Sequence, residues 1–203
     1  MIRALIIAAL LSGCSTPPPA PSQHLLGVRS ALILGGSVSS GFSGKPVPEI
    51  VAERLGLPYR NEASICHRVA PEETQSVGAD TLVINLDGNY WRSYDRDCAA
   101  AVVHVAAFYA NTDASARVVA TVPERNAGWF YRSVCGAQSA EQSCRAAINA
   151  ALIEGCTGRC MLIDADAIYA LHADITDIHL TPEIWRRVAD EHFDSVVAKL
   201  RSK

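Results

Sequence analysis

The chain has 203 residues, of which 49% are hydrophobic and 19% charged, and its formal net charge at pH 7 is -3. This composition excludes a disordered or collagen-like chain, and the length suits one domain with a sizeable core. The 18 basic and 21 acidic residues create no field that would attract nucleic acid, so no nucleic-acid partner is expected. The chain has seven cysteines, an odd number, so at least one of them cannot pair with another within the chain. The N-terminal sequence indicates which one.

The N-terminal residues are typical of an export signal. Arg3 precedes an apolar run over residues 4–11, which is too short to span a bilayer as a helix but suits a signal peptide. The run leads into Leu-Ser-Gly-Cys at residues 11–14, which resembles the lipobox of bacterial lipoproteins, where cleavage leaves the cysteine lipidated. We therefore expect a signal peptide over residues 1–13 and a lipid on Cys14. A plain secretory signal with a chance cysteine is the alternative.

A tether follows the expected lipid anchor. Residues 14–28 are rich in proline and cannot form a core, so they would hold the domain at residues 29–203 off a membrane as a semi-rigid spacer. Ser15, rather than aspartate, follows Cys14, which resembles the outer-membrane sorting signal of Gram-negative lipoproteins. These features predict a lipid-anchored protein of the bacterial cell envelope, on the outer membrane and facing the periplasm.

The other six cysteines form an even set, which in an exported chain is typical of disulfides because the periplasm is oxidising. Sequence alone does not choose among the possible pairings. Closeness along the chain favours three pairs: Cys156 with Cys160, Cys135 with Cys144, and by elimination Cys66 with Cys98. A zinc site at Cys156 and Cys160 is the alternative, but no second ligand pair at a fitting spacing accompanies them, so neither metal nor cofactor is expected.

From residue 29 the chain alternates short apolar runs with helical patterns. This predicts an α/β fold, a doubly wound three-layer sandwich around a mostly parallel sheet of about five strands. Expected strands cover residues 31–34, 58–64, 81–86, 117–122 and 160–163. Helices are expected after Pro46, after Asp97 as an N-cap, over residues 139–154 and from Pro182. Ligands of such sheets bind at the carboxyl ends of the strands, so residues there are the candidates for chemistry.

Two segments carry the parts of a nucleophilic site. Gly35-Gly36-Ser37 follows the first expected strand, where a tight turn would present the serine hydroxyl and backbone N–H groups to the crevice. The segment Asp-Ile-Thr-Asp-Ile-His at residues 174–179 precedes the last helix, and a histidine beside carboxylates is typical of an oriented general base. The alternatives are a plain Gly/Ser-rich loop and residues that only form a turn and a cap.

With these segments the chain resembles the SGNH (GDSL) hydrolase superfamily over residues 32–200. In that family a serine follows the first strand in a Gly-Asp-Ser motif, and an Asp-x-x-His motif precedes the last helix. The resemblance implies Ser37 as the nucleophile, with Gly36 in place of the usual aspartate, and His179 as the general base. It also implies the α/β fold described above.

The orienting acid departs from the family pattern. Thr176, not aspartate, stands three residues before His179, as though one residue had been deleted. Asp177 is therefore the expected orienting acid, and Asp174 is the alternative. A Ser-His dyad without an acid also stays open.

The resemblance implies an oxyanion hole as well. The family's Gly-x-Asn-Asp block appears here as Asp87-Gly88-Asn89, so Asn89 matches the oxyanion-hole asparagine. A second block should supply the N–H of a glycine near residues 65–67, and that segment, Ile-Cys-His, contains none. The hole would thus consist of the Ser37 N–H and Asn89, with the backbone of residue 66 or 67 contributing. Gly36 and Trp91 are the other expected substrate-binding residues.

The sequence accordingly predicts a membrane-tethered serine ester hydrolase that acts by Ser-His(-Asp) acyl transfer. We expect a monomer, with a small-molecule ester or an acylated glycan as its substrate. One alternative is a catalytically inactive binding lipoprotein of the same fold, because Gly36, Thr176 and Asp87 all depart from the family blocks. Another is an envelope glycan O-acyltransferase, in which a sugar hydroxyl replaces water.

Overall fold

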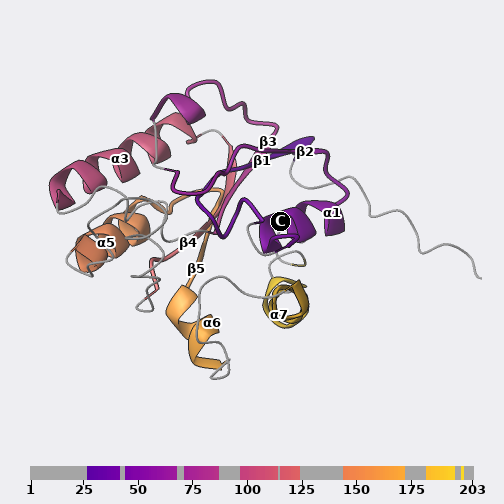
Figure 1. Cartoon of the computed structure of the whole chain (residues 1–203). Helices are drawn as coiled ribbons and strands as arrows, with labels where there is room; N and C mark the ends of the chain where they lie inside the picture. Colours follow the sequence, from indigo (N-terminus) through magenta and orange to yellow (C-terminus); the bar gives the residue numbers. More distant parts are fainter. Residues whose placement is uncertain are drawn as a thin grey trace, which may run out of the picture.

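The computed structural model describes residues 27–41, 44–67, 71–86, 97–113, 115–123, 144–171, 182–194 and 198. Its centre is a five-stranded sheet with the order β2-β1-β3-β4-β5, in which all neighbouring strands are parallel (Figure 1). The predicted α/β class and parallel sheet are confirmed, and every observed strand overlaps a predicted one. The strands are β1 (Ser30–Ile33), β2 (Tyr59–Asn61), β3 (Thr81–Asn85), β4 (Ala116–Ala120) and β5 (Cys160–Ile163).

The central strands are apolar because both faces of the sheet are covered. Alternate side chains of a strand point to opposite faces. In β3, Leu82 and Ile84 therefore belong to one buried cluster, whereas Val83 belongs to the other. All three side chains are fully buried. A strand that is buried on both faces has consecutive apolar residues. The apolar run in the sequence therefore predicted β3.

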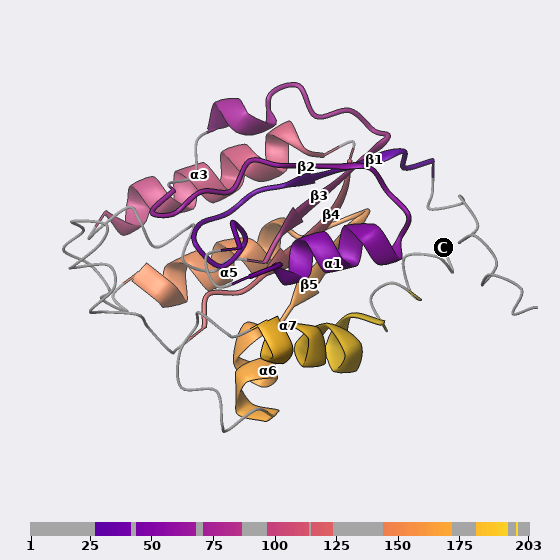
Figure 2. The same cartoon turned by 45° about the vertical axis from the view of Figure 1, so that its right-hand side comes forward.

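Helices form a layer on each face, which confirms the predicted three-layer sandwich. Helix α1 (Val47–Arg54) and helix α7 (Pro182–Val188), which continues into the π-helical turn η3 (Ala189–Phe193), cover one face (Figure 2). Helices α3 (Cys98–Asn111) and α5 (Arg145–Gly155) cover the other. The remaining helical segments are α6 (Ala165–Leu171) after β5 and the short 3-10 helix η1 (Pro71–Thr74).

Local sequence signals explain several helix boundaries. The Asp97 carboxylate accepts a hydrogen bond from the Ala100 N–H at 2.9 Å, so the predicted N-cap of α3 is confirmed. Of the helix expected over residues 139–154, the structure describes the part from residue 144. There Ile148 and Leu152 are buried, whereas Ala147 is exposed. Helix α6 was not predicted.

The disulfides correct the expected pairing. The pair Cys156–Cys160 is confirmed, with a Cα–Cα distance of 5.2 Å. The expected pairs of Cys98 with Cys66 and of Cys144 with Cys135 are wrong, because Cys98 is bonded to Cys144 at a Cα–Cα distance of 4.9 Å. The physical reason is that α3 and α5 pack side by side with their N-termini together, which brings distant residues into reach (Figure 1). Cys66 is also disulfide-bonded, whereas Cys135 lies outside the described residues.

Bonding to each other removes Cys156 and Cys160 as thiolate ligands, so the zinc alternative is ruled out at that pair. In the described ranges no group of three or more His, Cys, Asp or Glu side chains is placed to hold a metal ion. None of the helices in the same ranges is both long and apolar enough to pass through a membrane.

The strand order contains a switch point. From β1 the chain crosses to β2 on one side, and from β2 it returns to β3 on the other side of β1. The loops that follow β1 and β3 consequently leave the same edge of the sheet from adjacent strands. In open parallel sheets with this order, ligands bind in the crevice outside the carboxyl ends of the strands at that point. The turn that follows β1 is therefore the first place to look for a site.

Candidate functional site

The turn after β1 contains Ser37. Gly35 has φ 138°, a value that residues with a Cβ rarely adopt. The carbonyl of Gly36 accepts a hydrogen bond from the Ser40 N–H at 3.0 Å, and the Ser40 hydroxyl donates to the Ser37 carbonyl at 3.1 Å. These bonds reverse the chain directly beyond the strand, and so Ser37 and Gly36 stand where the sequence predicted them.

The turn is well shielded from water. Ser37 is 3% exposed, and Ser39 is fully buried. Within the described ranges the Ser39 hydroxyl has no hydrogen-bond partner. The burial keeps bulk water away from the turn, and electrostatic interactions with a developing charge are stronger where water is excluded.

Asn61, the last residue of β2, braces the turn. Its Nδ2 donates to the Ser39 carbonyl at 3.0 Å and to Glu49 Oε1 of α1 at 2.8 Å. Its Oδ1 accepts from the Ala63 N–H at 3.0 Å. One amide side chain thus connects the end of β2, the turn after β1 and helix α1. Sequence reasoning missed Asn61, and its only signal was a polar residue at the carboxyl end of a strand.

The loop after β2 lies beside the same turn. Beyond the strand itself, Glu62 N–H donates to the Ile33 carbonyl at 2.9 Å, and Ser64 N–H donates to the Gly35 carbonyl at 3.2 Å. Cys66 follows with φ 61°, and of the described residues it is the only non-glycine with a positive φ. This is the segment in which the family resemblance asked for a glycine. The structure shows a cysteine there in the backbone conformation that favours glycine.

His67 is held by an acid. Its Nε2 lies 2.8 Å from Glu73 Oε1 of η1, and both side chains are half-buried. The carboxylate accepts from an Nε2–H, and this bond orients the imidazole. Because His67 N–H also donates to the Ser64 carbonyl at 3.1 Å, the ring belongs to the loop that contacts Gly35.

The other predicted site residues lie outside the described residues. Within the sequence, the expected oxyanion-hole block begins two positions after Asn85, the last residue of β3, and the expected base stands three positions before Pro182, the first residue of α7. The roles given to these residues therefore stay predictions. They are Asn89, Trp91, Asp174, Asp177 and His179, together with Cys14 of the N-terminal segment.

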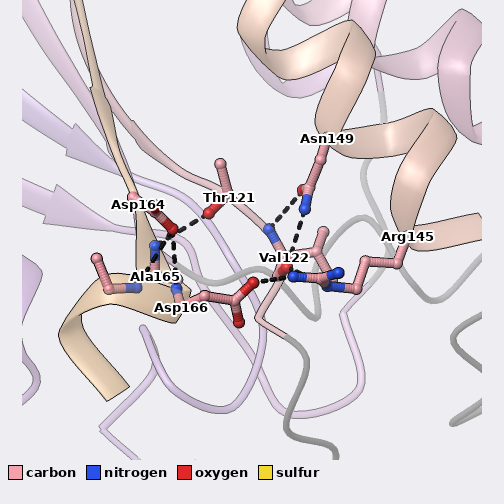
Figure 3. A network of polar contacts seen from close by, with 8 residues as sticks. Thr121, Val122, Arg145, Asn149, Asp164, Ala165 and Asp166 are labelled. Atoms are coloured by element: carbon pink, nitrogen blue, oxygen red, sulfur yellow. Dashed lines mark hydrogen bonds and ion pairs between the residues drawn. The ribbon is translucent and has the colours of Figure 1, made fainter. Parts of the chain in front are cut away.

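A polar network holds the carboxyl ends of β4 and β5 (Figure 3). Asn149 of α5 accepts from the Val122 N–H at 2.8 Å and donates to the Val122 carbonyl at 3.1 Å. Arg145 Nε donates to the same carbonyl at 3.0 Å, and its guanidinium also pairs with the Asp166 carboxylate of α6. Each of these polar groups is used to join one element to another, so the network supports the edge of the sheet.

Helix α6 begins in that network. The Thr121 hydroxyl accepts from the Ala165 N–H at 3.0 Å, and Asp164 Oδ1 accepts from the Asp166 N–H at 3.1 Å (Figure 3). Aspartate before a run of small and apolar residues is a helix-start signal. That signal was present at Asp164, and it would have found α6.

The opposite edge of the sheet holds two titratable groups whose pKa values are shifted by burial. Arg117 of β4 is 1% exposed, and burial lowers its pKa from the ordinary arginine value. Its guanidinium donates to the carbonyls of Tyr109, at 3.3 Å, and Thr157, at 2.8 Å, and it lies 5.5 Å from the centre of the Tyr109 ring. Burial also raises the pKa of Tyr109 to about 12. Two of the three guanidinium nitrogens are bound by carbonyls, whereas the buried Nε has no hydrogen-bond partner among the described residues, so these contacts link β4 to α3 and to the loop before β5.

Comparison with solved structures finds similar chains. No family model and no curated protein matches the chain. The crystal structure of protein YXIM_BACsu from Bacillus subtilis is similar, with a TM-score of 0.49 and 12% sequence identity. The match covers 86% of this chain and 55% of that chain, so this chain spans about half the length of the structure it matches.

Proposed function

We propose that the chain is a serine ester hydrolase in which Ser37 attacks the carbonyl of an ester or O-acyl group. The observation that carries the proposal is the position of Ser37, in a shielded turn at the carboxyl end of β1 and at the switch point of the parallel sheet. The other catalytic roles are assigned from the resemblance of the sequence blocks to those of SGNH hydrolases.

In the proposed reaction, His179 takes the proton of the Ser37 hydroxyl as the oxygen attacks the carbonyl, and Asp177 orients the imidazole. The tetrahedral oxyanion is stabilised by the Ser37 N–H and by Asn89, with the backbone of residue 66 or 67 contributing. The alcohol then leaves with the proton from His179, and an acyl-serine remains. Water, deprotonated by the same base, hydrolyses this ester to release the acid and restore Ser37.

The proposal also includes the location of the protein in the cell and the substrates it would meet there. A lipid on Cys14 and the proline-rich tether would hold a monomeric domain at the bacterial envelope, on the periplasmic side of the outer membrane. Substrates there include small esters and acylated glycans. If a sugar hydroxyl, rather than water, attacks the acyl-serine, the same residues give an O-acyltransferase.

The test uses the full chain in mild detergent, short p-nitrophenyl esters and a fluorophosphonate probe. Ser37→Ala and His179→Ala should abolish hydrolysis, and Ser37→Ala should also abolish labelling. The matched control is Ser39→Ala, which makes the same change two residues away. Because the Ser39 hydroxyl is buried and has no hydrogen-bond partner in the described part of the chain, its loss should leave the rate close to that of the wild type.

Equal hydrolysis by the wild type and Ser37→Ala would reject the proposal. An unlabelled wild type that binds an acylated glycan saturably would instead support the binding-protein alternative. Product analysis with and without an acceptor sugar separates hydrolysis from acyl transfer, since only transfer moves the acyl group onto the sugar.

A further inference from the structure

Cys66 has an unusual backbone conformation, and its side chain is in a disulfide that can maintain that conformation. Its φ of 61° lies in the left-handed region, which disfavours any residue with a Cβ, and its sulfur is in a disulfide. A strained backbone of this kind persists only where the surrounding structure over-determines it. The disulfide is a covalent constraint on the same residue.

The position of Cys66 connects it to the candidate nucleophile. Two residues before it, Ser64 N–H donates to the carbonyl of Gly35 at 3.2 Å, and Gly35 stands two residues before Ser37. One residue after it, His67 N–H donates back to the Ser64 carbonyl at 3.1 Å, which closes a turn around Cys66. Glu73 fixes the His67 ring at 2.8 Å. A change of backbone conformation at residue 66 would therefore rotate the amide groups of a loop attached to the Ser37 turn.

We propose that Cys66 is a positioning residue, whose disulfide holds a left-handed backbone and thereby fixes the loop at residues 62–67 against the turn that carries Ser37. The inference rests on the proposed function and deepens it. A glycine at residue 66 would adopt this conformation without a steric penalty, whereas a cysteine requires a constraint. In the absence of the disulfide, a residue with a Cβ shifts toward the right-handed region, and the loop amides turn away from the place where charge develops on the substrate.

The experiment compares Cys66→Gly with Cys66→Ala in the full chain. Both variants lose the disulfide and leave the same partner cysteine unpaired, so they differ only in the Cβ. The two variants are compared with each other on a p-nitrophenyl ester, because the wild type differs from both by the disulfide. Cys66→Ala should have a kcat about 5- to 30-fold lower than Cys66→Gly, the population change that corresponds to the cost of the left-handed region. KM should be unchanged, because the loop acts on the transition state rather than on substrate binding.

Gly158→Ala is the matched control for backbone strain. Gly158 has φ 62°, and an added Cβ there meets no atom within 4 Å. It lies between Cys156 and Cys160 at the amino edge of the sheet, away from Ser37. This variant should lose stability by about as much as Cys66→Ala loses relative to Cys66→Gly, and its kcat should stay at the wild-type value.

The outcomes distinguish a failure of the proposed function from a failure of the role proposed for Cys66. A wild type that neither hydrolyses esters nor labels at Ser37 overturns the proposed function and this inference with it. An active, labelled wild type with equal kcat values for Cys66→Gly and Cys66→Ala leaves the proposed function standing and overturns the inference. A loss of kcat in Gly158→Ala equal to that in Cys66→Ala also overturns it, because strain anywhere in the chain would then have the same effect.

Discussion

Asn61 offers the sharpest test of how the turn around Ser37 is built. The Nδ2 donates to Ser39 and to Glu49, and the Oδ1 accepts from Ala63. Glu49 is itself fixed by the Tyr59 hydroxyl, which donates to its other oxygen at 3.2 Å. Replacing the amide by a carboxylate, Asn61→Asp, removes both donated bonds and puts a second negative charge beside Glu49. Replacing it by alanine removes the bonds and adds no charge.

The contacts set the size of each effect. Three hydrogen bonds at about 0.5–1.5 kcal/mol each, in a half-buried place, give a loss of about 2 kcal/mol in the free energy of unfolding for Asn61→Ala. Asn61→Asp adds charge repulsion, which is about 1–4 kcal/mol for charges ~4 Å apart between water and a protein surface. At low pH one carboxyl of the pair binds a proton and donates it to the other. The repulsion is therefore absent in acid and appears as the pH rises.

The assay is urea unfolding followed by circular dichroism, at about pH 5 and about pH 8, for the wild type and both variants. The difference in stability between Asn61→Ala and the wild type should be similar at the two pH values. That between Asn61→Asp and the wild type should be larger at pH 8 than at pH 5, and should shrink with added salt. If the stability difference between Asn61→Asp and the wild type is the same at both pH values and does not change with salt, Glu49 is not a close neighbour of residue 61.

Two further predictions concern parts of the fold away from Ser37. The bond between Cys98 and Cys144 spans 46 residues, so the double change to alanine should lower the free energy of unfolding by about 4 kcal/mol, measured by urea unfolding; an unchanged midpoint would contradict the pairing. Gly155→Ala should cost about 1–3 kcal/mol in the same assay, because a Cβ at Gly155 would lie 2.1 Å from Tyr109 Cδ2. Full stability of that variant would show that the ring has room to move.

The fold could be predicted because a parallel sheet covered on both faces needs continuous apolar strands. Strand β3 is such a run, and Asp97 marks the start of the next helix. Strand β2 was harder to delimit, since it lies at the edge of the sheet and Tyr59 and Arg60 are exposed. Arg117 is the exception within β4, because a buried cation is tolerated there only through carbonyls supplied by two other elements.

The site was predictable only in the part that a local motif encodes. Ser37 follows a strand and two glycines, so its turn could be foreseen from neighbouring residues alone. Asn61 could not, because its partner Ser39 lies 22 residues earlier and meets it only when β2 pairs with β1. The same reason explains the wrong cysteine pairs, since Cys98 reaches Cys144 through the packing of two helices and not through closeness along the chain.

Local rules are broken at both edges of the sheet. At the amino edge, the guanidinium of Arg117 is buried: it donates to the carbonyls of Tyr109 and Thr157, but its Nε has no hydrogen-bond partner among the described residues. At the carboxyl edge, Cys66 has a backbone suited to glycine, in a loop that bonds to Gly35. Strained backbone is retained where the surrounding structure over-determines it, and such strain is concentrated at functional sites. Of the two departures, only the one at Cys66 lies in a loop attached to the Ser37 turn, and the comparison of Cys66→Gly with Cys66→Ala tests whether that loop affects turnover.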